Sequence, residues 1–472
     1  MLRRCFPRLG ITSTMVKDNY TLSTLSNGLR VLTCDDGNGI TGMGLFMLNG
    51  AKFENSDCAG AAAVFETLPL QSNQIYTDRE ISHALSGLGN AFKVTNNKEA
   101  ISVILMMPRY HQRDGLDLLN SMCLHPTRDE EQFRIAKERT FERALLCDRD
   151  ATSVCFELVH EAGWNGKGLG HPLNPKKEDL ERLTLQNFTA FHRACTRPER
   201  TVLAATGVSD HKSFAEEAER ALKFEPLQTS ESPSQSVPQF EAGYFPYTGG
   251  SRLEHHMEAP ESMNKFQEKN LSHVALFLQG VPINHPDYYN ISVIQTLLGG
   301  GTSFSSGGPG KGMQTKLFRE VLNREGFLHG LECITAWYSD GGLFGLYGTA
   351  PHEAVMSLLN VMVYQAASIC QRVSPKHLEM AKNQLRSQLI LLGEGREQLL
   401  SDMGFHLVVH NHIITATETM EGTRNITLDD LKRVCADMIK KPVTFAVYGD
   451  TSKMPSHEAL EEVLRSTYNK MN

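Results

Sequence analysis

The sequence predicts an α+β protein made of two similar halves of mixed α and β structure, joined by a linker near the middle of the chain. Three observations support this prediction. Strand and helix patterns alternate after residue 17, landmarks of the first half recur in the second, and residues 230–250 are rich in Ser, Pro and Gly. Because 472 residues are too many for one hydrophobic core, we expect one domain over residues 18–229 and another over residues 251–472.

The composition is that of an ordinary globular protein, with 40% hydrophobic and 21% charged residues. No apolar run approaches the roughly eighteen residues that a membrane-spanning helix needs. The ten cysteines are scattered without a C-x-x-C pair, a pattern typical of free thiols in a reducing compartment. The net charge of −7 argues against a nucleic-acid-binding surface and favours the attraction of basic partners.

The first seventeen residues have a composition of their own. They contain no acidic residue and four cations, which are Arg3, Arg4, Arg8 and Lys17. Small hydroxylated and apolar residues fill the spaces between these cations. This composition predicts a mitochondrial transit peptide over residues 1–17, with a frayed basic tail as the alternative. Removal of the segment would lower the net charge from −7 to about −11 through the loss of those four cations.

Apolar spacing and turn residues predict the elements that follow. Residues 20–33 hold two β-rich runs separated by Asn27-Gly28, a dipeptide that favours a tight hairpin turn. The remaining patterns predict strands over residues 42–48 and 101–107, and helices over residues 130–146, 151–162, 291–298 and 313–322.

Two pairs of landmarks define the repeat. One helical run opens at residues 133–137, and a similar run opens at residues 378–382, 245 positions later. Thr184 and Thr427, 243 positions apart, each precede a helix that leads through a strand to a glycine. Threonine is a preferred helix N-cap, so the two segments predict the same local structure. The alternative is a chance similarity between amphipathic helices.

A glycine-rich segment occupies residues 299–312 (GGGTSFSSGGPGKG), with seven glycines, one proline and one lysine in fourteen positions. Glycine loses the most conformational entropy on ordering, so such a run is kept where the backbone must move or approach something closely. A flexible linker is the alternative. A phosphate-binding loop is excluded, because G-x-x-x-x-G-K-[ST] would need glycine in place of Ser305 and Ser or Thr in place of Gly312.

Two further segments resemble the start of the pitrilysin-type (inverted zincin) peptidases. In that family a Leu-Ser-Asn-Gly-Leu-Arg-Val hairpin is followed by a strand, a Gly-x-x-x-Glu turn and a helix carrying H-x-x-E-H. Residues 25–31 match the hairpin and residues 50–54 match the turn. The glycine-rich segment resembles that of the α-type subunits of mitochondrial processing peptidases within this family. The resemblance covers essentially the whole chain from residue 18 onward.

The helix that follows departs from the family's metal motif. H-x-x-E-H places two histidines four apart on one helix face, where both can bind zinc, and its Glu activates the bound water. The matching positions here are Ala63, Glu66 and Thr67. The resemblance places the family's distal Glu ligand near Arg143 or Ala144, and neither can replace it. Glu142 would need a shift of one residue, which turns a helical side chain by about 100°. The resemblance therefore implies that this chain has no catalytic residue and no metal ligand.

Other candidate sites give weaker signals. His406 and His410 stand four apart, but the residues between them are apolar and include no Glu, which favours core or interface histidines over a metal pair. His160 and Glu161 begin like H-E-x-x-H, but Trp164 takes the place of the second histidine. The sequence contains no Gly-x-Ser-x-Gly nucleophile elbow.

The resemblance implies a non-catalytic, substrate-recognising subunit of a zinc endopeptidase, with two halves that close like a clamshell. It implies no cofactor in this chain, and zinc in a β-type partner subunit that forms a heterodimer with it in the mitochondrial matrix. The basic presequences of imported precursors are the expected ligands, because an acidic chain attracts them. The expected presequence-binding residues are Gly299, Gly300, Gly301, Ser303, Phe304, Gly307, Gly308, Pro309, Gly310, Lys311 and Gly312.

Two alternatives remain open. One is a structural core subunit of respiratory cytochrome c reductase (complex III), associated with the inner membrane, or a protein that combines both roles. That branch of the family lacks a well-formed Gly-Gly-Pro-Gly-Lys-Gly stretch, so the glycine-rich segment favours the processing-peptidase subunit. The other alternative is an active enzyme with atypical ligands.

Overall fold

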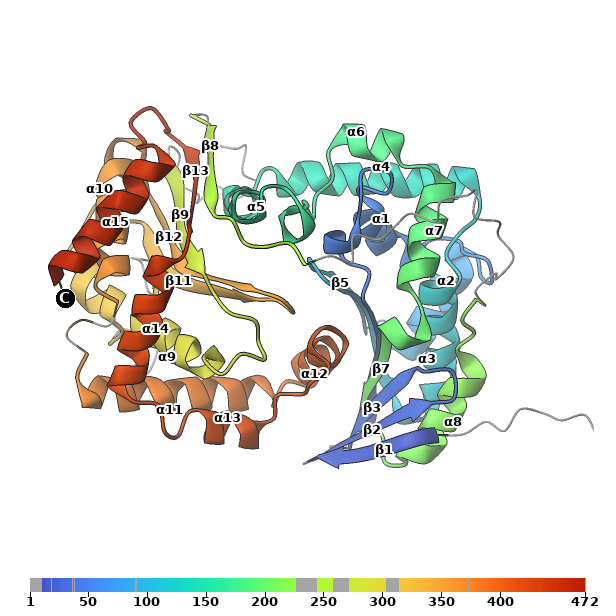
Figure 1. Ribbon diagram of the computed structural model, residues 1–472. Coiled ribbons are helices and arrows are strands. Elements are labelled where there is room, and N and C mark those ends of the chain that lie inside the picture. Colours follow the sequence, from blue (N-terminus) through green and yellow to red (C-terminus); the bar gives the residue numbers. More distant parts are fainter. Residues whose placement is uncertain are drawn as a thin grey trace, which may run out of the picture. The chain divides into compact units, whose positions relative to one another are not determined.

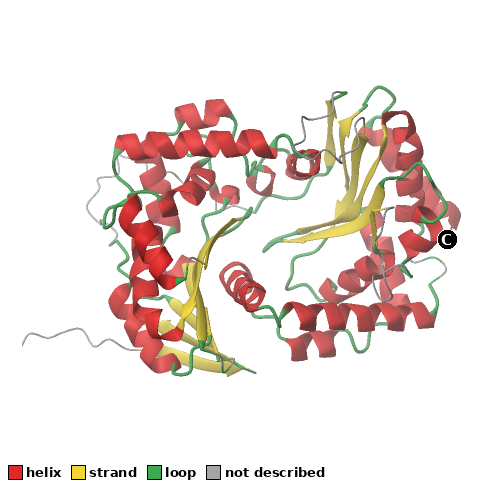
Figure 2. Cartoon of the chain, turned by 180° about the vertical axis from the view of Figure 1, so that it is seen from behind, coloured by secondary structure: helices red, strands yellow, loops and turns green. Residues whose placement is uncertain are grey.

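The protein folds into two compact units, each built around one mixed β-sheet (Figure 1; Figure 2). The computed structural model describes residues 11–17, 19–35, 37, 39–89, 91–225, 244–257, 271–302, 314–369, 371 and 373–471. The first unit comprises Met1–Ala144, Leu173–Ala242 and Leu392–Ile414. The second comprises Leu145–Pro172, Gly243–Leu391 and Thr415–Asn472.

The sheet of the first unit has the strand order β1-β2-β3-β7-β4-β6-β5 among the described residues. β3 and β7 are parallel, and the other neighbouring strands are antiparallel. The turn between β2 and β3 contains Asn27 and Gly28, as the sequence predicts, with Gly28 at φ +93°. The strands are β1 (Ile11–Lys17), β2 (Tyr20–Leu25), β3 (Arg30–Cys34), β4 (Ile40–Met47), β5 (Ala91–Asn96), β6 (Ile101–Pro108) and β7 (Thr201–Thr206).

The sheet of the second unit has the order β10-β11-β12-β9-β13-β8. Read from β8, the order β8-β13-β9-β12-β11 repeats the order β3-β7-β4-β6-β5 of the first unit. The parallel pair, β13 with β8, falls at the same place. The repeat predicted from the sequence is therefore confirmed at the level of sheet topology. These strands are β8 (Gly250–His255), β9 (Leu271–Gln279), β10 (Gly300–Thr302), β11 (Gly330–Trp337), β12 (Gly342–Pro351) and β13 (Val443–Gly449).

The helices repeat in the same way. α4 (Glu130–Cys147) and α11 (Pro375–Leu392) are each 18 residues long and contain the first pair of landmarks. Thr184 caps α7 (Leu185–Cys195) by accepting a hydrogen bond from the Asn187 N–H, at 3.1 Å. Thr427 caps α14 (Leu428–Lys440) through the Asp430 N–H, at 3.2 Å.

The other helices complete the two units. They are α1 (Ala61–Thr67), α2 (Asp78–Leu88), α3 (Gln112–Leu119), α5 (Ala151–Trp164), α6 (Lys177–Arg182), α8 (His211–Ala221), α9 (Tyr288–Leu298), α10 (Val355–Ala367), α12 (Arg396–His410), α13 (Ala416–Gly422) and α15 (His457–Met471). Single turns of 3-10 or π-helix are η1 (Ala51–Phe53), η2 (Leu68–Leu70), η3 (Arg109–His111), η4 (Asn120–Leu124), η5 (Gly168–Gly170), η6 (Pro198–Arg200), η7 (Phe318–Leu322) and η8 (His352–Ala354). The π-turn η7 replaces most of the regular helix that the sequence predicts over residues 313–322.

The compact units differ from the two contiguous domains that the sequence predicts, because each unit contains a helix from the other half of the chain. α12 packs on β4 and β7 of the first unit (Figure 1), where its Leu400, Met403 and Leu407 are buried against Phe46 and Val202. α5, the equivalent helix of the first half, packs on the sheet of the second unit. There its buried side chains include Cys155, Val159 and Trp164.

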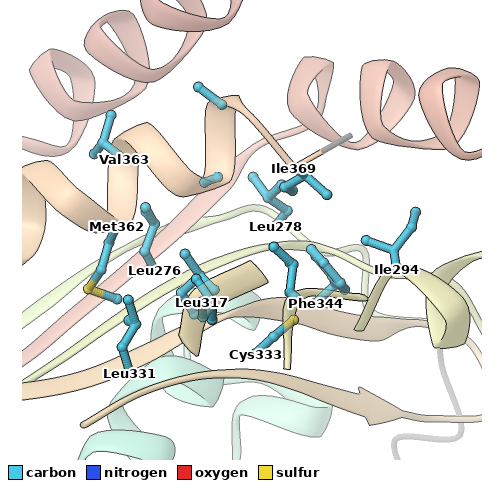
Figure 3. Close-up of a cluster of buried hydrophobic side chains, with 14 of the residues drawn as sticks. Leu276, Leu278, Ile294, Leu317, Leu331, Cys333, Phe344, Met362, Val363 and Ile369 are labelled. Atoms are coloured by element: carbon cyan, nitrogen blue, oxygen red, sulfur yellow. The ribbon is translucent and has the colours of Figure 1, made fainter. Parts of the chain in front are cut away.

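The opposite face of each sheet carries the larger core of its unit. Alternate residues of a strand point to opposite faces, so β9 directs Leu276 and Leu278 to one face and Phe277 to the other. On the first of these faces, Phe344 of β12 packs among side chains from α9 and α10 (Figure 3). In the first unit, α1, α2, α3, α7 and α8 contribute to the corresponding core.

The segment predicted as a transit peptide overlaps the first sheet. Residues 1–10 lie outside the described residues, but β1 is an edge strand paired with β2. Its register runs from Ile11 opposite Leu25 to Lys17 opposite Tyr20. A cut after residue 17 would remove this strand. Among the described helices, none combines the length and the hydropathy needed to cross a bilayer.

Candidate functional site

The metal-motif positions lie on α1, whose N-terminus is held by Glu54 of the Gly-x-x-x-Glu turn. The buried Glu54 carboxylate accepts hydrogen bonds from the main-chain N–H groups of Gly60, at 2.8 Å, and Ala62, at 2.7 Å. These are orphan donors of the first helical turn, so the carboxylate takes the place of an N-cap side chain. Burial raises the pKa of Glu54 to about 7 against the lowering effect of the two hydrogen bonds.

The two positions that carry histidines in the family hold side chains that are not available to bind a metal. The Ala63 methyl is buried and has no donor atom for a metal. The Thr67 hydroxyl donates to the Val64 carbonyl oxygen at 2.9 Å and lies 3.3 Å from both the Ala136 carbonyl oxygen and the Thr140 hydroxyl. Ala136 and Thr140 belong to α4, so Thr67 joins α1 to α4.

Glu66, the carboxylate that remains from the motif, forms an ion pair with Arg143 of α4. The two side chains are 24% and 29% exposed, so the pair is neither fully buried nor fully solvated. The resemblance aligns the family's distal ligand with Arg143 or Ala144, and Ala144 is buried. The neighbouring Glu142 is exposed. The sequence locates Arg143 but does not reveal the ion pair, because the two partners are separated by 76 residues.

These residues do not fit a zinc site. Zinc in proteins is bound by thiolate, imidazole or carboxylate, typically four ligands in a tetrahedral arrangement. The positions in question offer a methyl group, a hydroxyl group that is already hydrogen-bonded, and a guanidinium that carries a permanent positive charge. Within the described residues, no group of three or more His, Cys, Asp or Glu side chains is arranged to hold a metal ion.

The remaining histidine candidates are packing residues. His406 and His410 lie on α12 with ring centroids 6.2 Å apart. Burial, with additional effects of His406 and Lys52, lowers the pKa of His410 to about 3. His160 is buried in the second unit, with its Nε2 2.5 Å from the Tyr338 hydroxyl and its ring stacked on Trp164.

The glycine-rich segment is described only at its beginning. Gly299 ends α9 with φ +59°, and its carbonyl oxygen accepts a hydrogen bond from the Cys333 N–H at 2.9 Å. Gly300 has φ +106°, and a Cβ at this position would lie 2.2 Å from the Leu331 carbonyl oxygen. Only glycine fits this close approach of β10 to β11. The predicted residues Ser303, Phe304, Gly307, Gly308, Pro309, Gly310, Lys311 and Gly312 lie outside the described residues.

A solvent-open cavity lies at the base of this segment in the second unit. Its lining includes Leu297 and Met380, which are apolar, and Arg319, whose Nη1 is 2.9 Å from His377 Nε2. Thr315 also lines it, and a Cβ on Gly299 would come within 2.4 Å of the Thr315 side chain. The cavity and the first glycines therefore share a wall. Sequence patterns gave no signal for this cavity, because its residues come from α9, η7 and α11.

Comparisons with known proteins match both halves of the chain to one peptidase family. Residues 30–176 match the family Insulinase (Peptidase family M16), and residues 182–385 match the Peptidase M16 inactive domain. The mitochondrial-processing peptidase subunit alpha of Caenorhabditis elegans is 26% identical over 457 residues, covering 94% of this chain and 88% of that protein. The protein of the same name from Bos taurus is 27% identical over 451 residues, covering 94% and 85%.

A solved structure has the same fold. It is a chain of complex III2 from Candida albicans, with a TM-score of 0.75 and coverage of 94% of this chain and 99% of that chain. Its identity is 17%, so the likeness concerns the fold alone. The two family matches together span most of the chain, in agreement with the repeated topology. The chain belongs to peptidase family M16.

Proposed function

We propose that the chain is the non-catalytic, substrate-recognising α subunit of a mitochondrial processing peptidase. One observation carries the proposal most directly. The chain is similar over 94% of its length to proteins named as such α subunits, while Ala63, Thr67 and Arg143 stand where a catalytic member would bind zinc. A chain that keeps the fold of the family but lacks the zinc ligands is suited to act as the non-catalytic partner of a chain that has those ligands.

The partner that this proposal requires is a β-type subunit that holds the zinc and performs the hydrolysis. This chain then has no cofactor of its own, and its Glu66 carboxylate has no water to activate. The heterodimer would work in the mitochondrial matrix. Its substrates would be the basic presequences of imported precursors, which the net charge of −7 attracts.

The glycine-rich segment is the proposed presequence-binding element. Its first residues are held in place, because Gly299 accepts a hydrogen bond from β11 and Gly300 pairs with that strand. Adaptable backbone contacts suit a protein that must accept many unrelated peptides. The lining of the cavity beside Gly299 combines apolar and polar side chains with two cations, Lys316 and Arg319, and one carboxylate, Glu320. This excess of positive charge makes the cavity a poor site for an arginine of the peptide.

We propose that the transit-peptide cut lies before β1, near residue 10. The three arginines and the absence of acidic residues in residues 1–10 support a transit peptide, while the pairing of Ile11–Lys17 with β2 supports retention of that strand in the mature chain. Sequencing the N-terminus of the protein purified from mitochondria tests this position. A mature chain that begins after residue 17 contradicts it.

A reconstitution experiment tests the proposed function. The full chain and a zinc-bearing β-type subunit are purified separately, and cleavage of a radiolabelled precursor is measured for each alone and for the mixture. We expect activity only in the mixture. Deletion of residues 301–310 should reduce processing at least tenfold while the two subunits still co-purify. Cleavage by this chain alone contradicts the assignment, and undiminished processing after the deletion contradicts the role of the segment.

A second candidate function is that of a core subunit of complex III. The TM-score of 0.75 to a chain of complex III2 favours it at the level of fold. The two candidate functions predict different binding partners. Affinity purification from detergent-solubilised mitochondria should recover haem-containing membrane proteins if the chain is a core subunit, and a soluble zinc-containing partner if it is a processing-peptidase subunit. A chain with both roles recovers both.

A further inference from the structure

We propose that the Arg143 guanidinium is a built-in cation that takes the place of the family's metal between α1 and α4, and that it keeps metal out of this site. The inference concerns residues of the first unit and does not rest on the proposed function. It explains why a carboxylate is present at position 66 of a chain that lacks the histidine ligands. It also states that Arg143 excludes metal from the site, which does not follow from the loss of the histidines alone.

The first argument is the position of the charge. A catalytic member of the family would place a divalent cation beside the carboxylate at position 66 and a carboxylate ligand near position 143. Here an arginine at that point reaches back to Glu66, so one positive charge already neutralises the Glu66 carboxylate. Arginine remains protonated in proteins, so this charge cannot be switched off by pH.

The second argument is the cross-link between the helices. A metal held by ligands from α1 and α4 would join the two helices. In this chain the Glu66–Arg143 ion pair and the Thr67 hydroxyl, 3.3 Å from Thr140 Oγ1, make that connection without a metal. α1 is only seven residues long, so side-chain contacts of this kind contribute much of what holds it.

The third argument concerns what restoration of the ligands would achieve. Ala63 and Thr67 are four apart on one helix, so histidines at both positions would share a face. Two imidazoles are an incomplete zinc site. At the position where the family's third ligand would lie, Arg143 is a cation within ion-pairing distance of Glu66. Like charges disfavour each other strongly in a partly buried site. The two histidines alone should therefore bind zinc poorly.

The experiment compares three variants of the full chain in zinc buffered by a chelator. The first is Ala63→His/Thr67→His, the second adds Arg143→Glu, and the third adds Arg139→Glu instead. Arg139 is an exposed arginine of the same helix, so the third variant has the same change of net charge. Bound zinc is measured by atomic absorption after equilibrium dialysis, and folding is checked by circular dichroism.

We expect about one zinc per chain in the Arg143→Glu variant, with an affinity at least 100-fold higher than that of the other two. Equal zinc binding by the first and second variants overturns the proposal, because it shows that Arg143 does not exclude metal. Equal binding by the second and third variants shows that only net charge matters and also overturns it. A folded Arg143→Glu variant without zinc has the same consequence.

A double-mutant cycle in the natural sequence decides the matter if the variant with restored ligands does not fold. Arg143→Gln should lower the ratio of folded to unfolded protein about tenfold, because the partly buried Glu66 loses its partner, whereas Arg139→Gln should have little effect. Adding Glu66→Gln to Arg143→Gln should recover part of the loss. Equal effects of Arg143→Gln and Arg139→Gln contradict the structural role of the pair.

Discussion

Glu54 and Arg143 show how single side chains maintain the helix that carries the altered motif. Glu54 binds the N-terminus of α1 through two main-chain N–H groups, and Arg143 binds Glu66 near its C-terminus. Both contacts involve groups that burial makes costly to leave without a hydrogen-bonding or ionic partner. α1 is therefore held at its N-terminus by a residue of the preceding turn and near its C-terminus by a residue distant in sequence, and each end can be probed separately.

The pKa of Glu54 gives the first prediction. The value is raised from 4.5 to about 7 by burial, so the folded protein holds the proton more tightly than the unfolded chain. The stability contributed by the protonated group is complete below pH 4.5 and is lost as the pH rises through 7. Glu54→Gln keeps a neutral side chain, so its free energy of unfolding relative to the natural chain should rise by about 3 kcal/mol between pH 5 and pH 8.

Thermal or urea unfolding of both proteins across this pH range checks the prediction. The matched control is Glu142→Gln, the same substitution at an exposed glutamate. A difference between Glu54→Gln and the natural chain that is the same at every pH would show that the carboxyl titrates normally.

At the level of individual residues, the sequence predicted the positions of the site but not its contacts. Ala63, Glu66 and Thr67 could be located because the spacing of H-x-x-E-H is local to one helix. The pairing of Glu66 with Arg143 depends on how α1 packs on α4, which no local pattern contains. The same limit applies to the cavity beside Gly299, whose walls come from helices far apart in sequence.

Among the elements, α12 lies close to its sheet at a glycine. Gly404 faces Phe46 of β4, and a Cβ at this glycine would lie 2.3 Å from the phenyl ring. Phe46 is fully buried, so the ring has little room to move away. The absence of a side chain at position 404 therefore lets the helix lie close to the strand.

This close fit gives the second prediction. Gly404→Ala should push α12 away from the sheet and lower the free energy of unfolding by about 2 kcal/mol, because overpacking of a buried contact costs roughly 1–3 kcal/mol. Gly87 of α2 is an exposed helical glycine with open space around it, and Gly87→Ala should instead stabilise the protein by about 0.5–1 kcal/mol. Urea unfolding of the two variants measures both effects. Equal changes would show that the contact of α12 with Phe46 is loose.

The elements that could be predicted from local sequence are those that apolar spacing and turn residues determine. The hairpin at Asn27-Gly28, the strand over 101–108 and the helix over 130–147 agree with the patterns to within one or two residues. The helix expected over 313–322 was less well predicted, since a π-turn has nearly the same apolar spacing as an α-helix but a different hydrogen-bond pattern.

For the whole molecule, the exchange of α5 and α12 is the feature that matters most. The sequence repeat predicted two halves with the same topology, and the strand orders confirm it. It could not predict the exchange, because the apolar face of an amphipathic helix fits a sheet of either half. Only the packing of Leu400, Met403 and Leu407 on the first sheet shows which one α12 covers.

The exchange gives the third prediction. Fragments 1–229 and 230–472, produced together, should associate and co-purify in equal amounts, because each contains a helix that covers the sheet of the other. Produced alone, each fragment lacks that helix, so we expect insoluble protein or exposed hydrophobic surface detected by dye binding. Fragments that are soluble and monomeric alone, with cooperative unfolding, would show that the exchanged helices are dispensable.

The exchange of helices also determines the order in which the protein can mature. The first sheet is finished by β7 at residue 206, yet one of its faces stays uncovered until α12, which ends at residue 410, packs on it. Until α12 packs, a broad apolar surface is exposed to association with other partly folded chains. We expect such a chain to need protection by chaperones until its second half is complete, and its two halves to reach their native state together.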